Sequence, residues 1–346
     1  MHRNPLRRAN RAAGTRRLVG CLQHVKKFRA EQPTHPVRCP LFHNSFMAIP
    51  TELDYYIVDV FTDTPLEGNP LAVVFDTAGI STERMQSIAR EFNLSETTFI
   101  ERRDPATEEA EGVRVRIFTT VEELNFAGHP TLGTAGVLRL AAPTVAIDNT
   151  IRLRLNVGAV PVHYRGEGLN GEMTQPDPDF GVELDPAEVA PLLGLEAGDL
   201  DAALAPQIVS TGTAFAIVVL RSLEALGRLK VNRDKASPWL RSRGARWFYL
   251  LAPDPNQDQG PTQWRARMQF TGGEDPATGS AAGCAISYLV ARGAAPSGQS
   301  IHLRQGVEIG RPSDLHLAAT LLGAKVTDVR VGGSTVPVAK GRLFLS

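Results

Sequence analysis

A short motif in the first half of the chain recurs in the second half, and this repeat constrains the fold more than any other feature. Residues 126–136 read FAGHPTLGTAG and residues 274–281 read EDPATGSA. Aligning His129 with Asp275 superimposes a proline, a glycine and a run of small residues. A polar residue followed by proline is typical of a helix N-terminus, with the polar residue as N-cap. We therefore predict that His129 and Asp275 cap two equivalent helices.

Two other pairs of segments repeat in the same order. RVRIFT at 114–119 corresponds to RARMQFT at 265–271, and NPLAVVF at 69–75 resembles TAFAIVV at 213–219. The first of these pairs alternates as half-exposed strands do. Three matched segments predict a duplicated fold with two related lobes. Because helix N-termini offer free N–H groups and a partial positive charge, the two helices would hold a small anionic substrate between the lobes.

The composition is typical of a globular protein with two domains of ordinary size. The chain has 346 residues, of which 42% are hydrophobic and 21% charged. No apolar run approaches the roughly 18–20 residues that span a membrane. The net charge of zero is unevenly distributed, since residues 1–46 hold ten basic residues and one acid, Glu31, which leaves a net charge of −9 on the rest. An acidic body gives no support to binding of nucleic acid or of anionic membranes.

The basic segment 1–46 has no clear helical or strand period. It is compatible with a transit peptide, with a nucleic-acid-binding arm, or with sequence upstream of a true start at Met47. The strand pattern begins abruptly at 54–61, which favours the third interpretation. We expect a disordered extension that contributes nothing to catalysis.

Cysteine usage excludes several kinds of site. Cys21 and Cys39 lie in the basic segment, so Cys284 is the one cysteine of the body. A single cysteine cannot form a disulfide framework, a CxxC redox pair or a thiolate metal site. A reducing, cytoplasmic setting is therefore the expectation.

The order of predicted elements indicates an α+β fold. Strands and helices are mixed without the strict β-α-β rhythm of a doubly wound sheet. We expect an N-terminal lobe over 54–165 and a C-terminal lobe over 175–320, with the crossover near 166–181. Closing strands within 325–346 would return to the N-terminal lobe. The acidic stretch Asp104–Glu111 is expected to be a polar loop.

Three ionisable residues stand at predicted element boundaries: Glu96, His129 and Asp275. Asp is a common N-cap, so Asp275 alone has a structural explanation, and Glu96 alone would be an ordinary surface residue. Histidine is a poor N-cap, which makes a functional role easier to argue for His129. In a cleft between symmetric lobes, His129 and Asp275 would face each other, hold a polar substrate and shift the pKa of a nearby carboxylate.

Other common sites lack their motifs. The Gly272-Gly273 pair is not followed by the Gly-Lys-Ser/Thr of a P-loop, and no G-x-G-x-x-G opens a helix after the first strand. No G-x-S-x-G elbow exists. The four histidines of the body show no metal-ligand spacing, so no metal site is predicted.

Six motifs together resemble the successive signatures of the PhzF-like isomerase family of phenazine biosynthesis. They occur in family order across about residues 54–346, and as a set they are highly specific. The motifs are VDVFT at 58–62, GNP at 68–70, NLSET at 93–97, FAGHPTLG at 126–133, EDPATGS at 274–280 and GRPS at 310–313.

The resemblance implies a fold and a set of site residues. The family is similar in fold to diaminopimelate epimerase, with two pseudo-symmetric lobes, a curved sheet around a central helix in each, and the site in the cleft between them. The resemblance places the general acid/base on Glu96 and the substrate-holding pair on His129 and Asp275. The positions near the polar groups of the substrate are Gly128, Gly279 and Ser280.

The resemblance also implies an activity. The expected reaction is a cofactor-independent proton transfer between carbons of a small, cyclic amino or hydroxy carboxylate. The epimerase relatives use two cysteines where this chain has His129 and Asp275, which excludes a two-thiol racemase. Thr120 and Asn125 stand where the family often has proline. A homodimer is a further expectation, and a non-catalytic ligand-binding or protein-interaction member of the same fold is the alternative.

Overall fold

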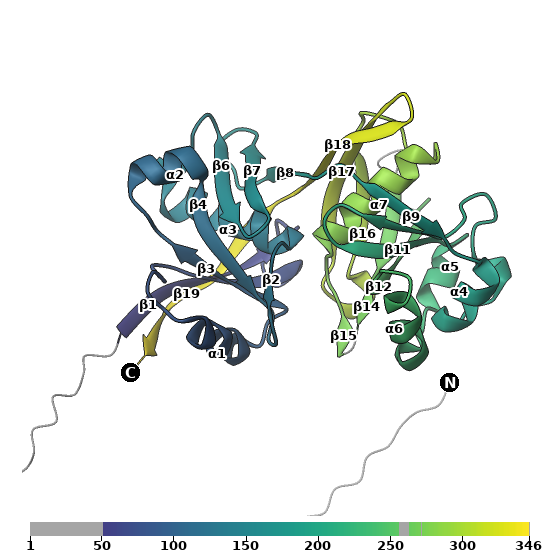
Figure 1. Cartoon of the computed structure of the whole chain (residues 1–346), viewed down its shortest axis with the longest axis horizontal. Helices are drawn as coiled ribbons and strands as arrows, with labels where there is room; N and C mark the ends of the chain where they lie inside the picture. Colours follow the sequence, from purple (N-terminus) through teal and green to yellow (C-terminus); the bar gives the residue numbers. More distant parts are fainter. Residues whose placement is uncertain (1–50, 256–262, 271, 346) are drawn as a thin grey trace, which may run out of the picture. The chain divides into compact units, whose positions relative to one another are not determined.

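A computed structural model describes residues 51–255, 263–270 and 272–345, so the basic segment 1–46 lies outside the described residues. The described chain forms mixed sheets with few helices, which confirms the α+β class. Two lobes are visible in Figure 1, one around helix α3 and one around helix α7.

The first lobe wraps its strands around α3. Strand β1 pairs antiparallel with β2, β2 pairs parallel with β3, and β3 pairs antiparallel with β4. The elements of this lobe are β1 (Thr51–Val60), β2 (Asn69–Val74), α1 (Thr82–Phe92), β3 (Glu96–Glu101), α2 (Pro105–Glu111), β4 (Val113–Phe118), β5 (Glu123–Leu124), α3 (Gly128–Ala141), β6 (Thr150–Leu155), β7 (Gly158–Tyr164) and β19 (Thr335–Leu345).

The second lobe repeats this plan around α7. Strand β10 pairs antiparallel with β11, β11 pairs parallel with β12, and β12 pairs antiparallel with β13, as in the first lobe. The elements are β9 (Asp179–Glu183), α4 (Pro186–Leu193), β10 (Gln207–Ser210), β11 (Ala214–Val219), α5 (Leu223–Gly227), α6 (Arg233–Arg241), β12 (Trp247–Pro253), β13 (Gln263–Arg267), β14 (Gln269–Phe270), β15 (Gly273–Glu274), α7 (Gly279–Ala291), β16 (Ile301–Gln305), β17 (Ser313–Leu322) and β18 (Lys325–Gly333).

Strand β8 (Gly171–Gln175) connects the sheets of the two lobes. It pairs with β7 on one side and with β18 on the other. The last strand, β19, lies antiparallel to β1 and so ends the chain in the first lobe. The residue boundaries predicted for the lobes stay a prediction.

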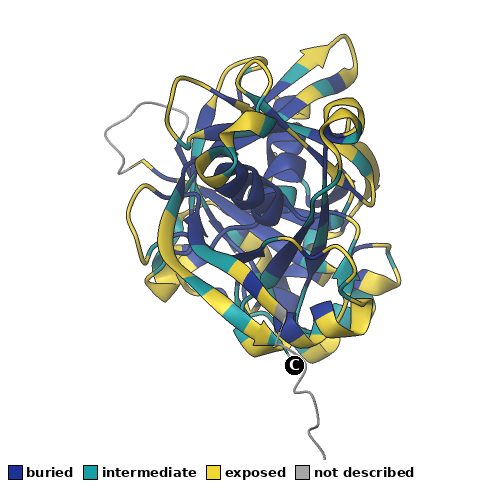
Figure 2. Cartoon of the chain, turned by 90° about the vertical axis from the view of Figure 1, so that its left-hand side faces the viewer, coloured by how far each residue is buried: buried dark blue, intermediate teal, exposed yellow. Residues whose placement is uncertain are grey.

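The central helices can be enclosed because their sequences are rich in small residues. Figure 2 looks onto the first lobe and shows a buried helix surrounded by strands with exposed outer faces. A Cβ atom on Gly133 would lie 2.7 Å from side-chain carbons of Leu71 and Val60, so glycine lets α3 approach β1 and β2 closely. Helix α7 is likewise buried along nearly all of its length.

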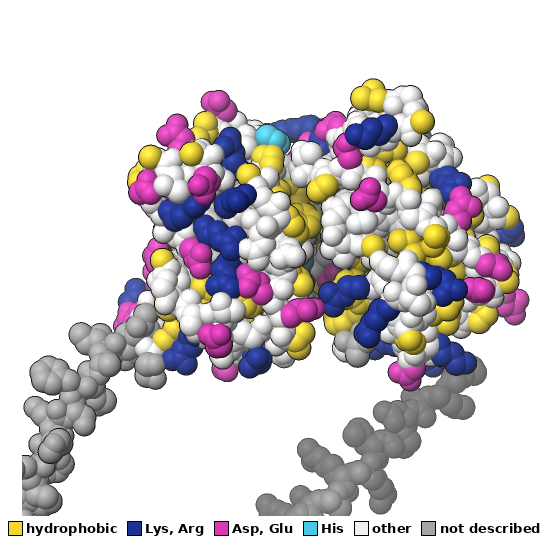
Figure 3. Space-filling view, in the orientation of Figure 1, with side chains coloured by type: hydrophobic (Ala, Val, Ile, Leu, Met, Phe, Trp, Pro, Cys, Tyr) yellow, Lys and Arg dark blue, Asp and Glu magenta, His cyan; other side chains and the backbone are white. Residues whose placement is uncertain are grey.

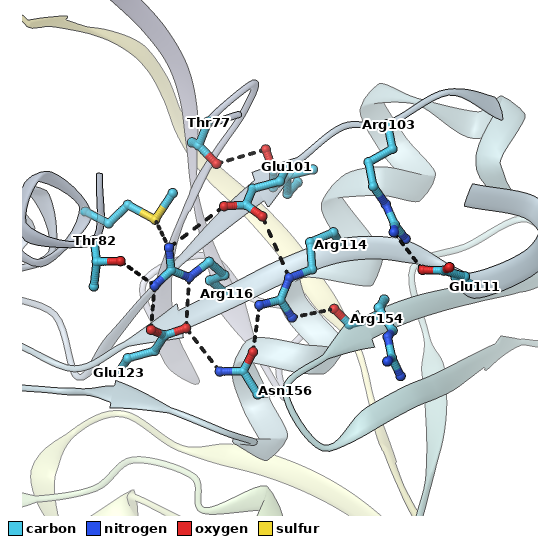
Figure 4. A network of polar contacts seen from close by, with 12 residues as sticks. Thr77, Thr82, Glu101, Arg103, Glu111, Arg114, Arg116, Glu123, Arg154 and Asn156 are labelled. Atoms are coloured by element: carbon cyan, nitrogen blue, oxygen red, sulfur yellow. Dashed lines mark hydrogen bonds and ion pairs between the residues drawn. The ribbon is translucent and has the colours of Figure 1, made fainter. Parts of the chain in front are cut away.

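An arginine–glutamate ion pair stabilises the segment that leads to each central helix. In the first lobe Arg116 Nε donates to Glu123 Oε1 over 2.9 Å, and Figure 4 shows this arginine between Glu123 and Glu101. In the second lobe Arg267 Nε donates to Glu274 Oε1 over 2.8 Å. The first ion pair links β4 to β5, the next strand along the chain, and the second links β13 to β15, which follows β14. Paired charges thus fix both segments that lead to the predicted site.

The acidic stretch Asp104–Glu111 is not the loop that we expected. It contains helix α2, because Asp104 accepts a hydrogen bond from the Thr107 amide over 3.0 Å and Pro105 occupies the first turn. The side chain of Glu108 is also held by Arg102. Capping and this ion pair stabilise a short helix in which the apolar stripe is weak.

Candidate active site

Glu96 is the first residue of β3, and its side chain is only 17% exposed. Helix α1 ends just before it, where Asn93 adopts a left-handed conformation (φ 51°). Parallel pairing places Glu96 beside Leu71 of β2. The turn between α1 and β3 therefore brings a carboxylate to the start of a buried strand.

His129 lies in the first turn of α3 and is buried. Its Nε2 atom is 3.4 Å from Glu96 Oε2 and has no hydrogen-bond partner among the described residues. Burial lowers the pKa of His129 to about 3, so the ring is neutral at physiological pH. The N-cap prediction for His129 was wrong: Ala127 is the N-cap, and it makes no side-chain cap.

Asp275 is buried in the loop before α7. Its two carboxylate oxygens accept hydrogen bonds from Asn69 Nδ2 (2.8 Å) and Thr278 Oγ1 (2.7 Å). The N-cap of α7 is Thr278, so the N-cap prediction for Asp275 was also wrong. Both oxygens of the carboxylate bind side chains, and neither caps the helix.

The N-termini of the two central helices meet at Gly128 and Gly279. A Cβ atom on Gly128 would lie 2.7 Å from the Ser280 amide nitrogen and 2.8 Å from Gly279 Cα. Two positive helix ends in contact attract negative charge, which the Asp275 carboxylate partly supplies. The same ends are suited to bind the carboxylate of a ligand.

The two carboxyl groups of the site differ in acidity. Burial, together with the charge of Asp275, raises the pKa of Glu96 to about 8. Burial raises the pKa of Asp275 to about 6, against the lowering effect of the hydrogen bonds from Thr278 and Asn69. At neutral pH Asp275 is therefore ionised and Glu96 largely protonated. A pair of titratable groups with separated pKa values is the usual arrangement of acid/base catalysis.

Sequence reasoning missed four polar residues that support the site. Asn69 Nδ2 lies 3.2 Å from His129 Nδ1 and so touches both His129 and Asp275. Gln305 donates to the Asp275 carbonyl and accepts from the Tyr249 hydroxyl and the Thr278 amide. Asn69 stands in the GNP motif, which was a signal that could have been used. Thr278 stands in the EDPATGS motif, whereas Gln305 and Tyr249 come from distant segments and carry no local signature.

The loop before α3 contains Thr120 and Asn125, where the family often has proline. Hydrogen bonds hold this loop instead: the Thr119 amide donates to the Glu122 carbonyl, and the Glu122 amide donates to Thr119 Oγ1. Glu122 also pairs with Arg246 of the second lobe over 3.1 Å, across the seam between the lobes visible in Figure 3.

Within the described ranges, no cluster of three or more His, Cys, Asp or Glu side chains has the arrangement of a metal site. None of the described helices is both long and apolar enough to cross a membrane. The catalytic and binding roles of Glu96, His129, Asp275, Gly128, Gly279 and Ser280 stay predictions, although the structure places all six around one point.

Comparison with known proteins places this arrangement in a family. The family model described as phenazine biosynthesis-like protein matches residues 58–341. The chain is 37% identical over 297 residues to trans-2,3-dihydro-3-hydroxyanthranilate isomerase of Pseudomonas aeruginosa, covering 84% of this chain and 99% of that protein.

Solved structures share the fold of this chain. A predicted epimerase from Pseudomonas aeruginosa shares 34% identity and a TM-score of 0.71, covering 85% of this chain and 100% of the other. A phenazine biosynthesis protein of the PhzF family from Bacillus anthracis, 24% identical over 85% of this chain and 100% of its own, has a TM-score of 0.75 and is similar in fold. The chain therefore belongs to the phenazine biosynthesis-like family, as a PhzF-like isomerase with the diaminopimelate epimerase-like fold.

Proposed function

We propose that the protein moves a proton between two carbons of a small, cyclic amino or hydroxy carboxylate without a cofactor. The observation that carries this proposal is the Glu96 carboxyl, which lies 3.4 Å from His129 Nε2 with a pKa raised to about 8. No Arg or Lys within the described residues forms an ion pair with it. A carboxyl of this kind can both accept and return a proton near neutral pH.

The proposed reaction is an allylic isomerisation. Ionised Glu96 removes a proton from an activated carbon, so that a C–H bond breaks and a carboxyl O–H bond forms. The electron pair shifts the double bond along the ring, and Glu96–H returns the proton to a second carbon. One carbon loses a proton and a second carbon gains one, so no oxidant or reductant is needed.

The remaining predicted residues would orient the substrate. The N-termini at Gly128, Gly279 and Ser280 would bind its carboxylate through backbone N–H groups. His129 and ionised Asp275 would bind its amino or hydroxyl group, since one presents a ring nitrogen without a partner and the other a carboxylate.

The named relative suggests the first substrate to test. Trans-2,3-dihydro-3-hydroxyanthranilate is a cyclic compound with amino, hydroxyl and carboxylate groups, which fits the proposed class. We further propose that the protein acts in the cytoplasm, because Cys284 is a free, buried thiol. The homodimer stays a prediction for analytical ultracentrifugation.

The pH dependence of the reaction tests the proposal. Only ionised Glu96 can accept a proton, so kcat/KM for this substrate should rise about tenfold per pH unit between about 6 and 8 and level off above about 8. Below about 6, protonation of Asp275 should make the dependence steeper. Related cyclic acids should be screened by thermal shift and followed by NMR for movement of the double bond. Binding without conversion of any compound would contradict the proposal and favour the non-catalytic alternative.

A further inference from the structure

Asn69, the first residue of β2, is completely buried and joins the two lobes at the site. Its Nδ2 atom lies 2.8 Å from Asp275 Oδ1, 2.8 Å from the Ala277 carbonyl oxygen and 3.2 Å from His129 Nδ1. Its Oδ1 atom has no hydrogen-bond partner within the described residues. One amide nitrogen thus contacts the first-lobe histidine and the second-lobe aspartate.

The surroundings of Asn69 determine which way its amide faces. The Ala277 carbonyl can only accept a hydrogen bond, and so can the ionised Asp275 carboxylate. If the amide oxygen pointed toward them, three acceptors would meet with no proton. The NH2 group must therefore face Asp275 and Ala277.

This orientation determines which ring nitrogen of His129 carries the proton. A proton on Nδ1 would point at an NH2 group, so that two donors would face each other at 3.2 Å. Nδ1 therefore carries no proton. The amide has two protons for three acceptors, so its contact with Nδ1, the longest of the three, shares a proton with Asp275 or Ala277. A neutral histidine has one ring proton, which is then on Nε2, on the side of Glu96.

We propose that Asn69 is a positioning residue that holds His129 in the Nε2–H tautomer, with this N–H directed at Glu96 and the bound substrate. The catalytic importance of this tautomer rests on the proposed function, whereas the tautomer itself does not. Removal of the partners that orient metal-ligating histidines commonly costs about 10–100-fold in metal affinity or activity, and we expect an effect of similar size for the non-metal His129.

A clamp from the second lobe fixes the turn that carries Asn69. Arg311 donates to the Gly68 carbonyl (2.8 Å), to the Glu67 carbonyl (2.8 Å) and to Asp59 Oδ1 (2.6 Å). Gly68 has φ +68°, and a Cβ atom there would lie 2.5 Å from the Val60 carbonyl oxygen. The turn therefore needs glycine, and Arg311 sets its position. Arg311 of the GRPS motif thus positions Asn69 of the GNP motif, and Asn69 in turn contacts His129.

The wild-type protein gives the first test, by NMR of the protein labelled with ¹⁵N in histidine. The signals that vanish in His129→Gln identify the ring of this residue. We expect an unprotonated Nδ1 and a protonated Nε2. A proton on Nδ1, or on both nitrogens, at neutral pH would overturn the proposal whether or not the protein is active.

The second test uses Asn69→Leu, which keeps the side-chain volume and removes the donors. We expect the Nδ1–H tautomer to become populated and kcat/KM to fall about 10–100-fold. The matched control is Thr98→Val, since Thr98 is buried in the same lobe and its hydroxyl bonds to Thr134 and the Ala72 carbonyl. The control should lower thermal stability without changing tautomer or turnover.

Arg311→Lys covers the case in which Asn69→Leu fails to fold. Lysine keeps the charge beside Asp59 but cannot reproduce the forked donation to the Gly68 and Glu67 carbonyls. We expect a smaller rise in the Nδ1–H population and a smaller loss of kcat/KM than in Asn69→Leu. An unchanged tautomer and unchanged kcat/KM in the folded variants would overturn the proposal. A wild-type Nε2–H tautomer in a protein that converts no substrate would instead refute the proposed function alone.

Discussion

Replacing Glu96 with Gln is expected to lower kcat at least about 10³-fold, because general acid/base groups commonly contribute 10²–10⁴-fold and this one would serve in both proton transfers. Glutamine has nearly the same shape and cannot exchange a proton. Substrate affinity should change only a few-fold, since the helix N-termini, His129 and Asp275 would still bind the ligand. Steady-state kinetics and calorimetric titration measure the two quantities separately.

Glu101→Gln is the matched control for this change. Glu101 ends the same strand, β3, and pairs with Arg114 and Arg116 on the outer face, away from His129. The control should retain wild-type kcat. Comparable losses of kcat in both variants would mean that the loss arises from disturbance of β3. That result would contradict the role of Glu96.

Stability against pH gives an independent signature of the Glu96 carboxyl. Its folded pKa is about 8, above the ordinary value of 4.5, chiefly because burial penalises the charge. A raised folded pKa means that the stability linked to this group is present below about 4.5 and is lost as the pH rises through about 8. The melting temperature of the wild type should therefore fall relative to Glu96→Gln across this range.

Replacing Gly128 with Ala is expected to disrupt the site through the backbone. The added methyl group would lie 2.7 Å from the Ser280 nitrogen and 2.8 Å from Gly279 Cα, and these backbone atoms cannot turn aside as a side chain could. The two helix ends must separate. We expect a loss of about 1–3 kcal/mol in the free energy of unfolding, as for overpacked cores.

The same change should reduce kcat/KM at least about 100-fold, because displacement of a catalytic group by about 1 Å has effects of this size. Chemical denaturation and steady-state kinetics measure the two effects. Gly168→Ala is the control, since a Cβ atom there meets nothing within 4 Å. Wild-type activity in Gly128→Ala would show that the two helix ends need not touch.

The repeated motif predicted more of the fold than of the local geometry. It correctly indicated two related lobes with a buried helix in each, because small residues in register are needed wherever a helix is enclosed by a sheet. Ser81 was also a reliable signal: it caps α1 and accepts a hydrogen bond from the Arg84 amide over 3.3 Å.

Capping signals failed where tertiary contacts compete for the side chain. Asp104 is followed by proline and does cap α2, although we expected a loop there. Asp275 is followed by proline and does not cap α7, because Asn69 and Thr278 bind its carboxylate. The sequence alone does not reveal such partners, since Asn69 is 206 positions away.

The central claim is that Glu96 carries the proton, and a labelled substrate tests it most directly. The substrate should bear deuterium at the carbon that loses its proton, and NMR should follow the label with wild type and with Glu96→Gln. We predict that the wild type moves the deuterium to the second carbon or replaces it with solvent hydrogen. The variant should bind the substrate and leave the deuterium in place. Removal of the label by Glu96→Gln at a rate near that of the wild type would contradict this account.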